Sequence, residues 1–456
     1  MAVSEVTALT HGEALKIFFT DGVFVQVNEA FEDFKLLKRF KVDSAASVGS
    51  RQINWEIVSD LGIGAVGFPN VGRSGSDFIA AQQSSSSEKT AYLRELQATV
   101  EVEEGLVSRA LKSREQRYFE PLELEAKLKR LGMMKRLAFA LYQGGIGVIG
   151  EISSVNVNSA VANQAVVTLQ QTDTDIGFVG GFELNDRVVH KAAAGTAGTA
   201  PTISAGTFDY WLVKNKDRDA GTVTLAPVNT LGTTVNVSAW APAAGEAIYP
   251  DSQGTFPNTG SVTDWGTETD NIVGLESWSA DDSRTVFGVA MTGATKGSRY
   301  SASGSPIDPK HLQRGISRAK NTAGEGLYKY SMLQMAPETE DALIEGREAD
   351  RYFASVGDKS RGISGRFSYR HRGDALEVYS SEYVPSKRIY SVPQDVLQFH
   401  STDIEPIKAQ NGDILHLKPS ANGGHVNMFD MYLRGFMQIV CVKPSAIMCV
   451  HDFLNS

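Results

Sequence analysis

The sequence predicts an α+β fold, and three segments carry that prediction. Residues 50–102 hold two strand-like runs around a glycine- and serine-rich excursion. Residues 105–143 form one long, highly charged helical run, and residues 163–260 hold a series of short strands. Strand-like and helix-like segments then continue to the end of the chain. A fold built from these parts needs both kinds of secondary structure.

Residues 1–49 and 50–102 are predicted to form an N-terminal arm and an extended β-hairpin loop. In the loop, strand-like runs at 51–59 and 91–102 flank an excursion, 61–90, that has five glycines between Gly62 and Gly75 and few large apolar residues. Isolated hairpins are marginal in water, because their apolar surface does not offset the entropy lost on ordering. The loop must therefore lie on something else, and the nearest candidate is another copy of the chain.

Residues 103–162 are predicted to hold a spine helix and the start of the next domain. Apolar residues recur three or four positions apart, which is the helical period. These residues are Leu124, Leu128, Leu131, Met134, Ala138 and Leu141. Pro121 should kink or split the helix. At 1.5 Å per residue the run spans roughly 55–60 Å, so it can serve as a support to which other segments attach.

Residues 163–260 are predicted to form an inserted small β-barrel or sandwich. The segment is rich in Thr, Ala, Val and Gly, and turn residues separate its short strands at fairly regular intervals. The strands are expected at 165–169, 187–190, 208–214, 221–225 and 233–237. A mixed pattern resumes in residues 261–430, with helices at 309–319 and 337–354 and a hairpin at 365–393. Apolar strands at 431–456 close the chain.

Composition and charge exclude several classes of protein. The chain has 456 residues and a net charge of -9, which argues against a dedicated nucleic-acid binder. The sequence contains no run of about 18 apolar residues, so no membrane span is expected. The N-terminus lacks the pattern of a secretory signal. Cys441 and Cys449 lie eight residues apart in one extended run, too far apart for a disulfide, and are predicted to be small buried hydrophobes.

Two matches to the dinucleotide-binding pattern G-x-G-x-x-G, at 62–67 and 145–150, are predicted to be structural. The fingerprint needs a strand before it and a helix after it, whose N-terminal amides bind the pyrophosphate. The first match is followed by 68–72, which contains Pro69 and cannot be that helix. The second follows a helix and not a strand. Their glycines are expected to bend a thin loop and to end a helix.

No other catalytic or metal-binding pattern stands out, so the chain is predicted not to be an enzyme. The histidines are dispersed, with no pair at the i, i+4 spacing of a metal-binding helix. The acidic pairs Asp173/Asp175 and Asp281/Asp282 are expected in loops, solvated or forming turns, with a cation at the first pair as the alternative. The integrin-like triplet at 372–374 is predicted to be a hairpin turn. No catalytic, cofactor-binding or metal residue is predicted.

The order of these segments resembles that of a tailed-bacteriophage major capsid protein of the Hong Kong 97 fold. Three local strings add to the resemblance: GLESW at 274–278 followed by TVFGV at 285–289, LEVYSSEYVP at 376–385, and YLRG at 432–435 with 442–448. The resemblance covers nearly the whole chain.

The resemblance implies a structural role in a virion. The spine helix and closing strands would form a peripheral domain, residues 271–430 mostly an axial domain, and the loop at 50–102 would lie across neighbouring subunits. Hexamers and pentamers would build an icosahedral shell around double-stranded DNA, without sequence-specific binding, in the bacterial cytoplasm. Implied partners are a portal and separate scaffolding, cementing or decoration proteins. Some relatives crosslink through a loop lysine; Lys89 lies near this loop's tip, but no string identifies a partner.

Two alternatives remain open. An encapsulin-like nanocompartment shell is related in fold, but the predicted barrel insertion and the chain length count against it. A β-rich surface or adhesin protein is opposed by the absence of a signal sequence.

Overall fold

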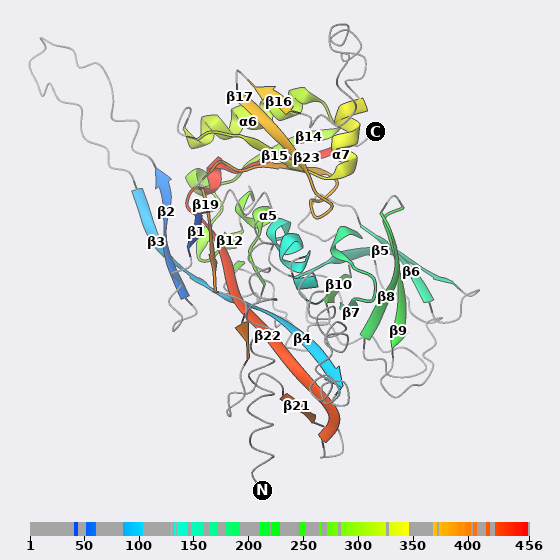
Figure 1. Cartoon of the computed structure of the whole chain (residues 1–456). Helices are drawn as coiled ribbons and strands as arrows, with labels where there is room; N and C mark the ends of the chain where they lie inside the picture. Colours follow the sequence, from blue (N-terminus) through cyan, green and yellow to red (C-terminus); the bar gives the residue numbers. More distant parts are fainter. Residues whose placement is uncertain are drawn as a thin grey trace, which may run out of the picture. The chain divides into compact units, whose positions relative to one another are not determined.

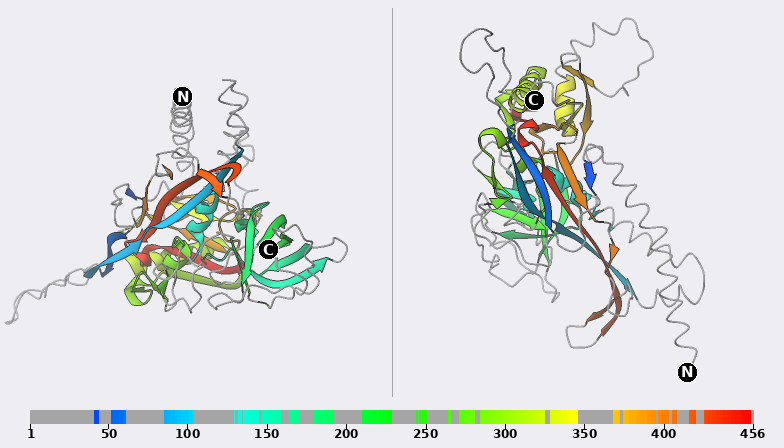
Figure 2. Two further views of the ribbon diagram at one scale, coloured as in Figure 1. Left: turned by 90° about the horizontal axis from the view of Figure 1, so that it is seen from below. Right: turned by 90° about the vertical axis from the view of Figure 1, so that its left-hand side faces the viewer.

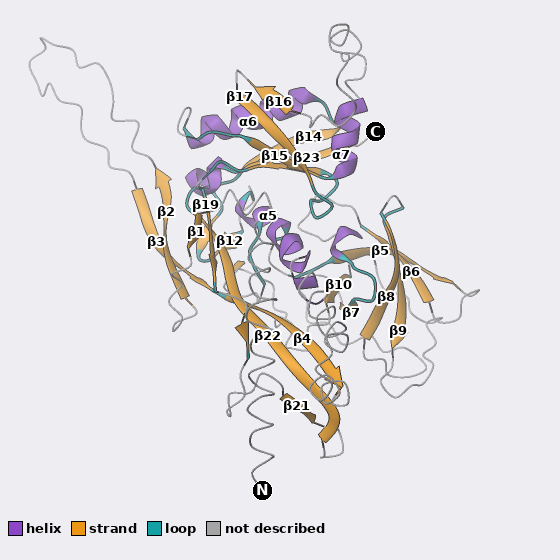
Figure 3. Cartoon of the chain, in the orientation of Figure 1, coloured by secondary structure: helices purple, strands orange, loops and turns teal. Residues whose placement is uncertain are grey.

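The computed structural model of the chain contains strands and helices arranged in two compact units (Figure 1). Unit 1 comprises Met1–Gln52, Leu93–Ala138 and Phe399–Gln438, and unit 2 comprises Ile53–Tyr92, Phe139–Gln398 and Ile439–Ser456. The structure describes residues 41–43, 52–60, 85–103, 129, 132–133, 135–144, 147–158, 164–170, 179–191, 210–218, 220–228, 244, 246–250, 264–265, 271–280, 284–324, 328–345, 368–371, 374–394, 396–402, 405–407, 416–419 and 425–454. Strands predominate in this part of the chain, so the fold is α+β and rich in strands (Figure 3).

Unit 1 is built around one long strand, β22 (His425–Cys441), whose last three residues belong to unit 2. Four strands of its sheet follow the order β1 (Lys41–Asp43), β19 (Leu397–Ser401), β22, β20 (Glu405–Pro406). Two further strands, β21 (His416–Pro419) and β4 (Arg94–Glu103), also pair with β22. The β4–β22 pair is antiparallel over ten residues, from Arg94 opposite Met437 to Glu103 opposite Met428, and the two strands run side by side in both views of Figure 2.

The largest sheet of unit 2 has six strands in the order β14 (Ser298–Pro306), β23 (Met448–Leu454), β18 (Arg388–Ser391), β15 (Met332–Met335), β17 (Asp374–Ser380), β16 (Ser368–His371). Helices α6 (Pro309–Ala323) and α7 (Pro337–Glu345) share one hydrophobic core with it. Members of this core include Leu312, Ile316, Leu333, Leu343, Ile389 and Val450. The side chain of Asp308 caps α6 by accepting from the Lys310 amide at 2.8 Å, and Pro309 starts the helix with its φ already fixed.

A closed six-stranded barrel forms a second part of unit 2. Its order is β10 (Ala247–Pro250), β5 (Gly150–Asn158), β6 (Gln164–Leu169), β9 (Thr222–Val228), β8 (Tyr210–Asp217), β7 (Arg187–Lys191). Alternate residues are buried along β6 and in the first four residues of β8 and of β9, and Trp211, Val213 and Leu225 are fully buried. Phe139 of the helical segment 135–142 belongs to the same core and lies against Gly181 of η5 (Val179–Gly181).

The remaining elements of unit 2 are short. β2 (Gln52–Asp60) and β3 (Ser85–Tyr92) form a two-stranded ribbon, and β11 (Asp264–Trp265), β12 (Thr285–Val286) and β13 (Val289–Ala290) form a three-stranded sheet. Single turns are α5 (Leu275–Trp278), η6 (Gly293–Thr295) and η7 (Pro444–Ala446). No helix among the described residues is long and apolar enough to cross a membrane.

The structure pairs the strands of the extended loop differently from the sequence prediction. The partner of β2 is β3, Ser85–Tyr92, whereas most of the predicted strand at 91–102 forms β4 and pairs with β22. Ser85–Thr90 is polar and lacks an apolar alternation, which is why the sequence did not mark it as a strand. The predicted excursion at 61–90 is therefore shorter by at least six residues.

The barrel and the closing segment also differ from their predicted boundaries. The barrel includes β5, which begins at Gly150 and so lies before the predicted start at 163. The closing segment 431–456 divides between two sheets, because η7 turns the chain between β22 and β23. Cys441 and Cys449 thus lie on different strands and not on one extended run, although both are buried and neither forms a disulfide.

Several predicted features lie outside the described residues. These are the arm before residue 41, the loop at 61–84, most of the spine helix before residue 129, including Pro121, and the strand at 233–237. The helical prediction is confirmed over 135–142, 309–319 and 337–345, and α6 continues beyond its predicted end to Ala323.

The barrel geometry predicts which fragment folds alone. A fragment of residues 135–255 contains every buried member of the barrel core, whereas 163–260 lacks β5 with Ile152, and also Phe139. The longer fragment should therefore unfold cooperatively on heating, with β-type circular dichroism, and the shorter one should show no cooperative transition. A cooperative transition in 163–260 would show that closure by β5 is not required.

Candidate functional site

The five residues 274–278 connect three parts of unit 2: the end of the helix at 135–142, the six-stranded sheet, and the base of the β2–β3 ribbon. We call these residues the hub. They comprise Gly274 and the single turn α5, and all five are buried. Gly274 and Ser277 contact the end of the helix, Glu276 contacts the sheet and Trp278 contacts the ribbon, so the segment connects all three within the unit.

Gly274 allows the hub to approach the end of the helix closely. A Cβ atom at this position would lie 2.4 Å from the carbonyl oxygens of both Ala140 and Gln143. Real Cβ atoms essentially never come this near to backbone oxygen, so only glycine fits. The hydroxyl of Ser277 then donates to the carbonyl of Gly144, which satisfies an acceptor at the end of the helix.

Glu276 carries the only acidic charge of the hub, and it is 1% exposed. Its carboxylate pairs with Arg299 of β14 and Arg388 of β18, which are 7% and 3% exposed, and it accepts from the hydroxyl of Tyr390. A buried carboxylate is costly unless it is paired and hydrogen-bonded. Two guanidinium groups and a phenol meet that requirement here.

The strand register places these partners in one row. Arg299 lies opposite Cys449, Cys449 opposite Tyr390, and Tyr390 opposite Gln334, across four adjacent strands. Arg388 is two residues before Tyr390, so its side chain lies on the same face. The alternate residues Ile389 and Val450 belong to the core that α6 and α7 cover. The hub and these two helices therefore contact opposite faces of the sheet.

Trp278 connects the hub to the ribbon. Its ring lies 6.3 Å from that of Trp55 on β2, edge to face, and 6.0 Å from that of Phe287, nearly parallel. Trp55 also meets Phe287 edge to face at 5.6 Å. Such aromatic contacts add roughly 0.5–1.5 kcal/mol each beyond area burial. Phe287 has a positive φ of 49° in the turn between β12 and β13, and its two aromatic neighbours hold it there.

Backbone contacts complete the anchor of the ribbon. The indole nitrogen of Trp55 donates to the Cys441 carbonyl at 3.1 Å, and the Val58 amide donates to the Val442 carbonyl at 2.9 Å. Burial raises the pKa of the Cys441 thiol, so this cysteine stays protonated and has little nucleophilic reactivity.

The ribbon has an apolar base and a polar outer part. Ile53, Trp55 and Ile57 are buried at alternate positions of β2, and Ala91 is buried at the end of β3. Farther along β3, residues 86–88 are exposed Ser, Ser and Glu. Lys89 donates to the Gly288 carbonyl at 3.4 Å. The base therefore belongs to the core of the unit, whereas β3 beyond it offers polar surface.

The structure assigns no ligand site to the described parts of the predicted motifs. Gly147, in the second glycine-rich match, has a φ of 76°, and the strand β5 follows it, so no helix presents amides there. His371 of β16 lies opposite Asp374 of β17, so the strands on either side of this position pair antiparallel. Arg372 and Gly373 of the integrin-like triplet lie outside the described residues, and the predicted turn stays a prediction. The first glycine-rich match and both acidic pairs lie outside the described residues, which contain no group of three or more potential metal ligands.

The sequence analysis missed the ionic role of Glu276. Its partners are 23 and 112 residues away in sequence, so no local spacing relates them. One signal was present, namely an acidic residue between the large apolar residues Leu275 and Trp278. An acid in such a position needs a buried basic partner.

Comparison with known proteins finds similarity in structure and none in sequence. No protein-family model matches the chain, and no curated protein matches it. The cyanophage A-1(L) capsid asymmetric unit aligns over 91% of this chain and 90% of its own, with 10% identity and a TM-score of 0.46.

Two further structures extend the comparison. A structure from Mycobacterium phage Bobi aligns over 92% of this chain and 90% of its own, with 10% identity and a TM-score of 0.41. The holo-SrpI encapsulin complex from Synechococcus elongatus aligns over 35% of this chain and 55% of its own, with 10% identity and a TM-score of 0.22.

We expect a substitution of Glu276 in the hub to lower the stability of the subunit strongly. Glu276→Gln keeps the shape of the side chain but leaves Arg299 and Arg388 buried without their counter-charge. It should lower the free energy of unfolding by about 3–5 kcal/mol, measured by denaturant titration. Glu340→Gln on α7, at a partly exposed position, is the matched control and should change it by less than about 0.5 kcal/mol. Equal effects of the two substitutions would contradict a special role for Glu276.

Proposed function

We propose that the chain is the major capsid protein of a tailed double-stranded DNA bacteriophage. The observation that carries this proposal is the ribbon β2–β3, which is anchored by Trp55 at its base and exposes polar residues beyond it. An element fixed so firmly at one end suits a role outside its own subunit, because it presents its outer part in a defined direction. A neighbouring subunit of a shell would supply the surface on which it lies.

The architecture supports a Hong Kong 97-type arrangement. In this interpretation the long β4–β22 pair and the spine helix belong to a peripheral domain, and the six-stranded sheet with α6 and α7 is the axial domain. The barrel would be an inserted domain. It is tied to the axial sheet by Arg218, which pairs with Glu338 of α7 and donates to the Glu382 carbonyl at 3.1 Å. Tyr383 also packs against the barrel core.

The proposed partners are mainly other copies of the chain, in hexamers and pentamers. A portal and separate scaffolding, cementing or decoration proteins would complete a virion assembled in the bacterial cytoplasm. The net charge of -9 suits a shell that encloses DNA without binding it tightly, because phosphate binding needs clustered Lys and Arg. No catalytic role is proposed.

An encapsulin-like shell is the second candidate, since it would also explain a self-associating chain. The barrel and the chain length favour the phage capsid over it. A surface or adhesin protein would not need an anchored assembly element.

Electron microscopy of the protein expressed in bacteria tests this proposal. We expect closed icosahedral shells or capsomers from the chain, alone or with its scaffolding protein. Shells that copurify with a specific enzyme cargo would favour the encapsulin alternative, and discrete monomers under all conditions would contradict both.

The ribbon gives a second prediction. Replacing residues 62–83 with Asn-Gly, a sequence that favours a tight hairpin turn, removes the outer loop but keeps β2 and β3. The variant should fold with an unchanged melting temperature but fail to form complete shells. Trp55→Ala is the contrasting variant, and loss of its buried ring should destabilise the subunit by about 3–5 kcal/mol. Unfolding of the loop variant would mean that residues 62–83 belong to the core of the subunit.

A further inference from the structure

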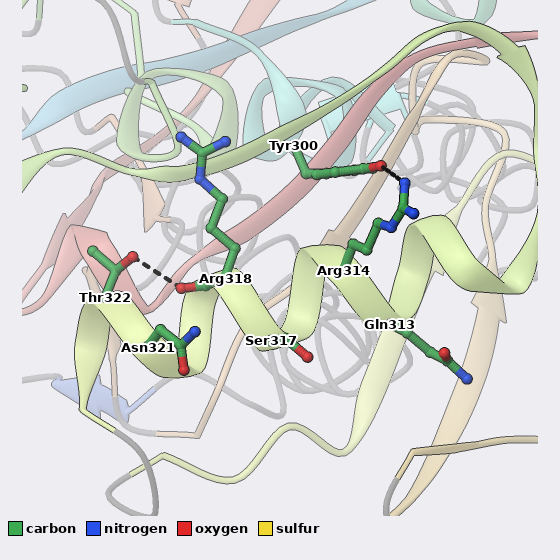
Figure 4. Close-up of a pocket in the computed structure, with 7 residues that line it drawn as sticks. All are labelled: Tyr300, Gln313, Arg314, Ser317, Arg318, Asn321 and Thr322. Atoms are coloured by element: carbon green, nitrogen blue, oxygen red, sulfur yellow. Dashed lines mark hydrogen bonds between the residues drawn. The ribbon is translucent and has the colours of Figure 1, made fainter.

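The outer face of α6 is uniformly basic. Between Pro309 and Ala323 the charged residues are Lys310, Arg314, Arg318 and Lys320, and no acidic residue occurs. Arg314 and Arg318 are exposed and one helical turn apart, and they line a hollow together with Tyr300 of β14. Figure 4 shows both arginines extending from the same side of the helix, with Arg314 donating to the Tyr300 hydroxyl at 3.2 Å.

Helix α7 is uniformly acidic. All its charged residues are acids, namely Glu338, Glu340, Asp341 and Glu345. Glu338 faces inward and pairs with Arg218 of the barrel. Asp341 and Glu345 are exposed and, like the two arginines, lie four residues apart.

Neither pair is neutralised within the described part of the chain. The side chains of Arg318, Asp341 and Glu345 make no hydrogen bond or ion pair with any described residue. Arg314 has a neutral phenol as its hydrogen-bond partner. Like charges at i, i+4 destabilise a helix by roughly 0.2–0.5 kcal/mol, so each helix carries an unfavourable pair in the isolated subunit.

We propose that α6 of one subunit docks on α7 of a neighbouring copy, with Arg314 and Arg318 facing Asp341 and Glu345. This inference rests on the proposed function as a self-assembling shell protein. The spacing is complementary, because residues four apart on a helix have Cβ atoms about 5–6 Å apart on both surfaces. Because the two faces are different parts of the same chain, the contact is head-to-tail, and head-to-tail contacts close into rings such as hexamers and pentamers.

The role of this contact is to select the register of the neighbour. Exposed ion pairs contribute little net stability, but complementary charge speeds association, and like charge opposes wrong pairings. The contact therefore determines which surfaces meet, while apolar burial and the ribbon supply cohesion. Added salt should slow ring formation more than it dissociates finished particles.

Charge reversal tests the contact. Arg314→Glu/Arg318→Glu makes both faces acidic, and Asp341→Lys/Glu345→Lys makes both faces basic. Each variant alone should lose at least about tenfold in assembly yield, measured by sedimentation and electron microscopy, because like charges then meet at every interface. A chain carrying all four substitutions should assemble to within about twofold of the unmodified protein, since the charges are exchanged and still complementary.

Mixing the two reversed variants gives a sharper test. Each variant then complements the other and not itself, so they should form rings with alternating subunits. Such rings have an even number of members, which permits hexamers and excludes pentamers, and hence closed icosahedral shells. Recovery of six-membered rings from two variants that fail alone is the expected result.

The control is Lys214→Glu/Lys329→Glu, which reverses two exposed basic residues of unit 2 outside α6 and should assemble normally. Thermal melting checks that every variant is folded. If the unmodified chain forms rings or shells and the reversed variants do so equally well, the contact is wrong while the proposed function stands. If the unmodified chain does not self-associate at all, both fail.

Discussion

The buried carboxylate of Glu276 is the interaction on which the arrangement of the hub, the six-stranded sheet and the base of the ribbon depends. Two arginines from different strands, β14 and β18, share this one acidic partner, and all three groups are almost inaccessible to water. A charge cluster of this kind is stable only in one geometry, because each group that loses its partner is left desolvated. The turn α5 is therefore held at one place on the sheet. Gly274 then fixes the position of the end of the helix at 135–142, and Trp278 fixes the position of the base of the ribbon.

This arrangement separates folding from assembly along a single ribbon. The apolar residues that stabilise the subunit, Ile53, Trp55 and Ile57, all lie on β2, where the aromatic cluster holds them. The described outer part of β3 offers Ser, Thr and charged groups, which lose little by staying in water until a partner covers them. Under the proposed function, a subunit built in this way would fold first and assemble later. Fewer apolar groups would then be exposed to wrong associations before a shell forms.

Local sequence patterns predicted those elements whose stability is local. The strand-like run predicted at 51–59 corresponds to β2, in which Ile53, Trp55 and Ile57 alternate as buried residues, and the helix predicted at 309–319 lies within α6, which Asp308 caps. The same local patterns did not predict strands that form only by pairing with distant segments. β3 is a strand because β2 is beside it, and β5 joins the barrel although its residues precede the Thr- and Ala-rich segment. The hub string GLESW was recognisable, but the arginines that fix Glu276 come from distant strands that only the fold brings together.

In the proposed docking, the acidic helix α7 would serve both the subunit and its neighbour. Glu338, in the first turn, faces the barrel and meets the forked guanidinium of Arg218, a geometry that fixes orientation as well as charge. That pair connects the barrel to α7, and Leu343 of α7 also belongs to the core of the six-stranded sheet. Asp341 and Glu345 are exposed on the same helix. Ordering exposed side chains reduces the net gain from an ion pair, and a well-anchored helix reduces this loss. In the docking proposed above, the pair of Glu338 would therefore help α7 to present its outer acids to the basic face of α6.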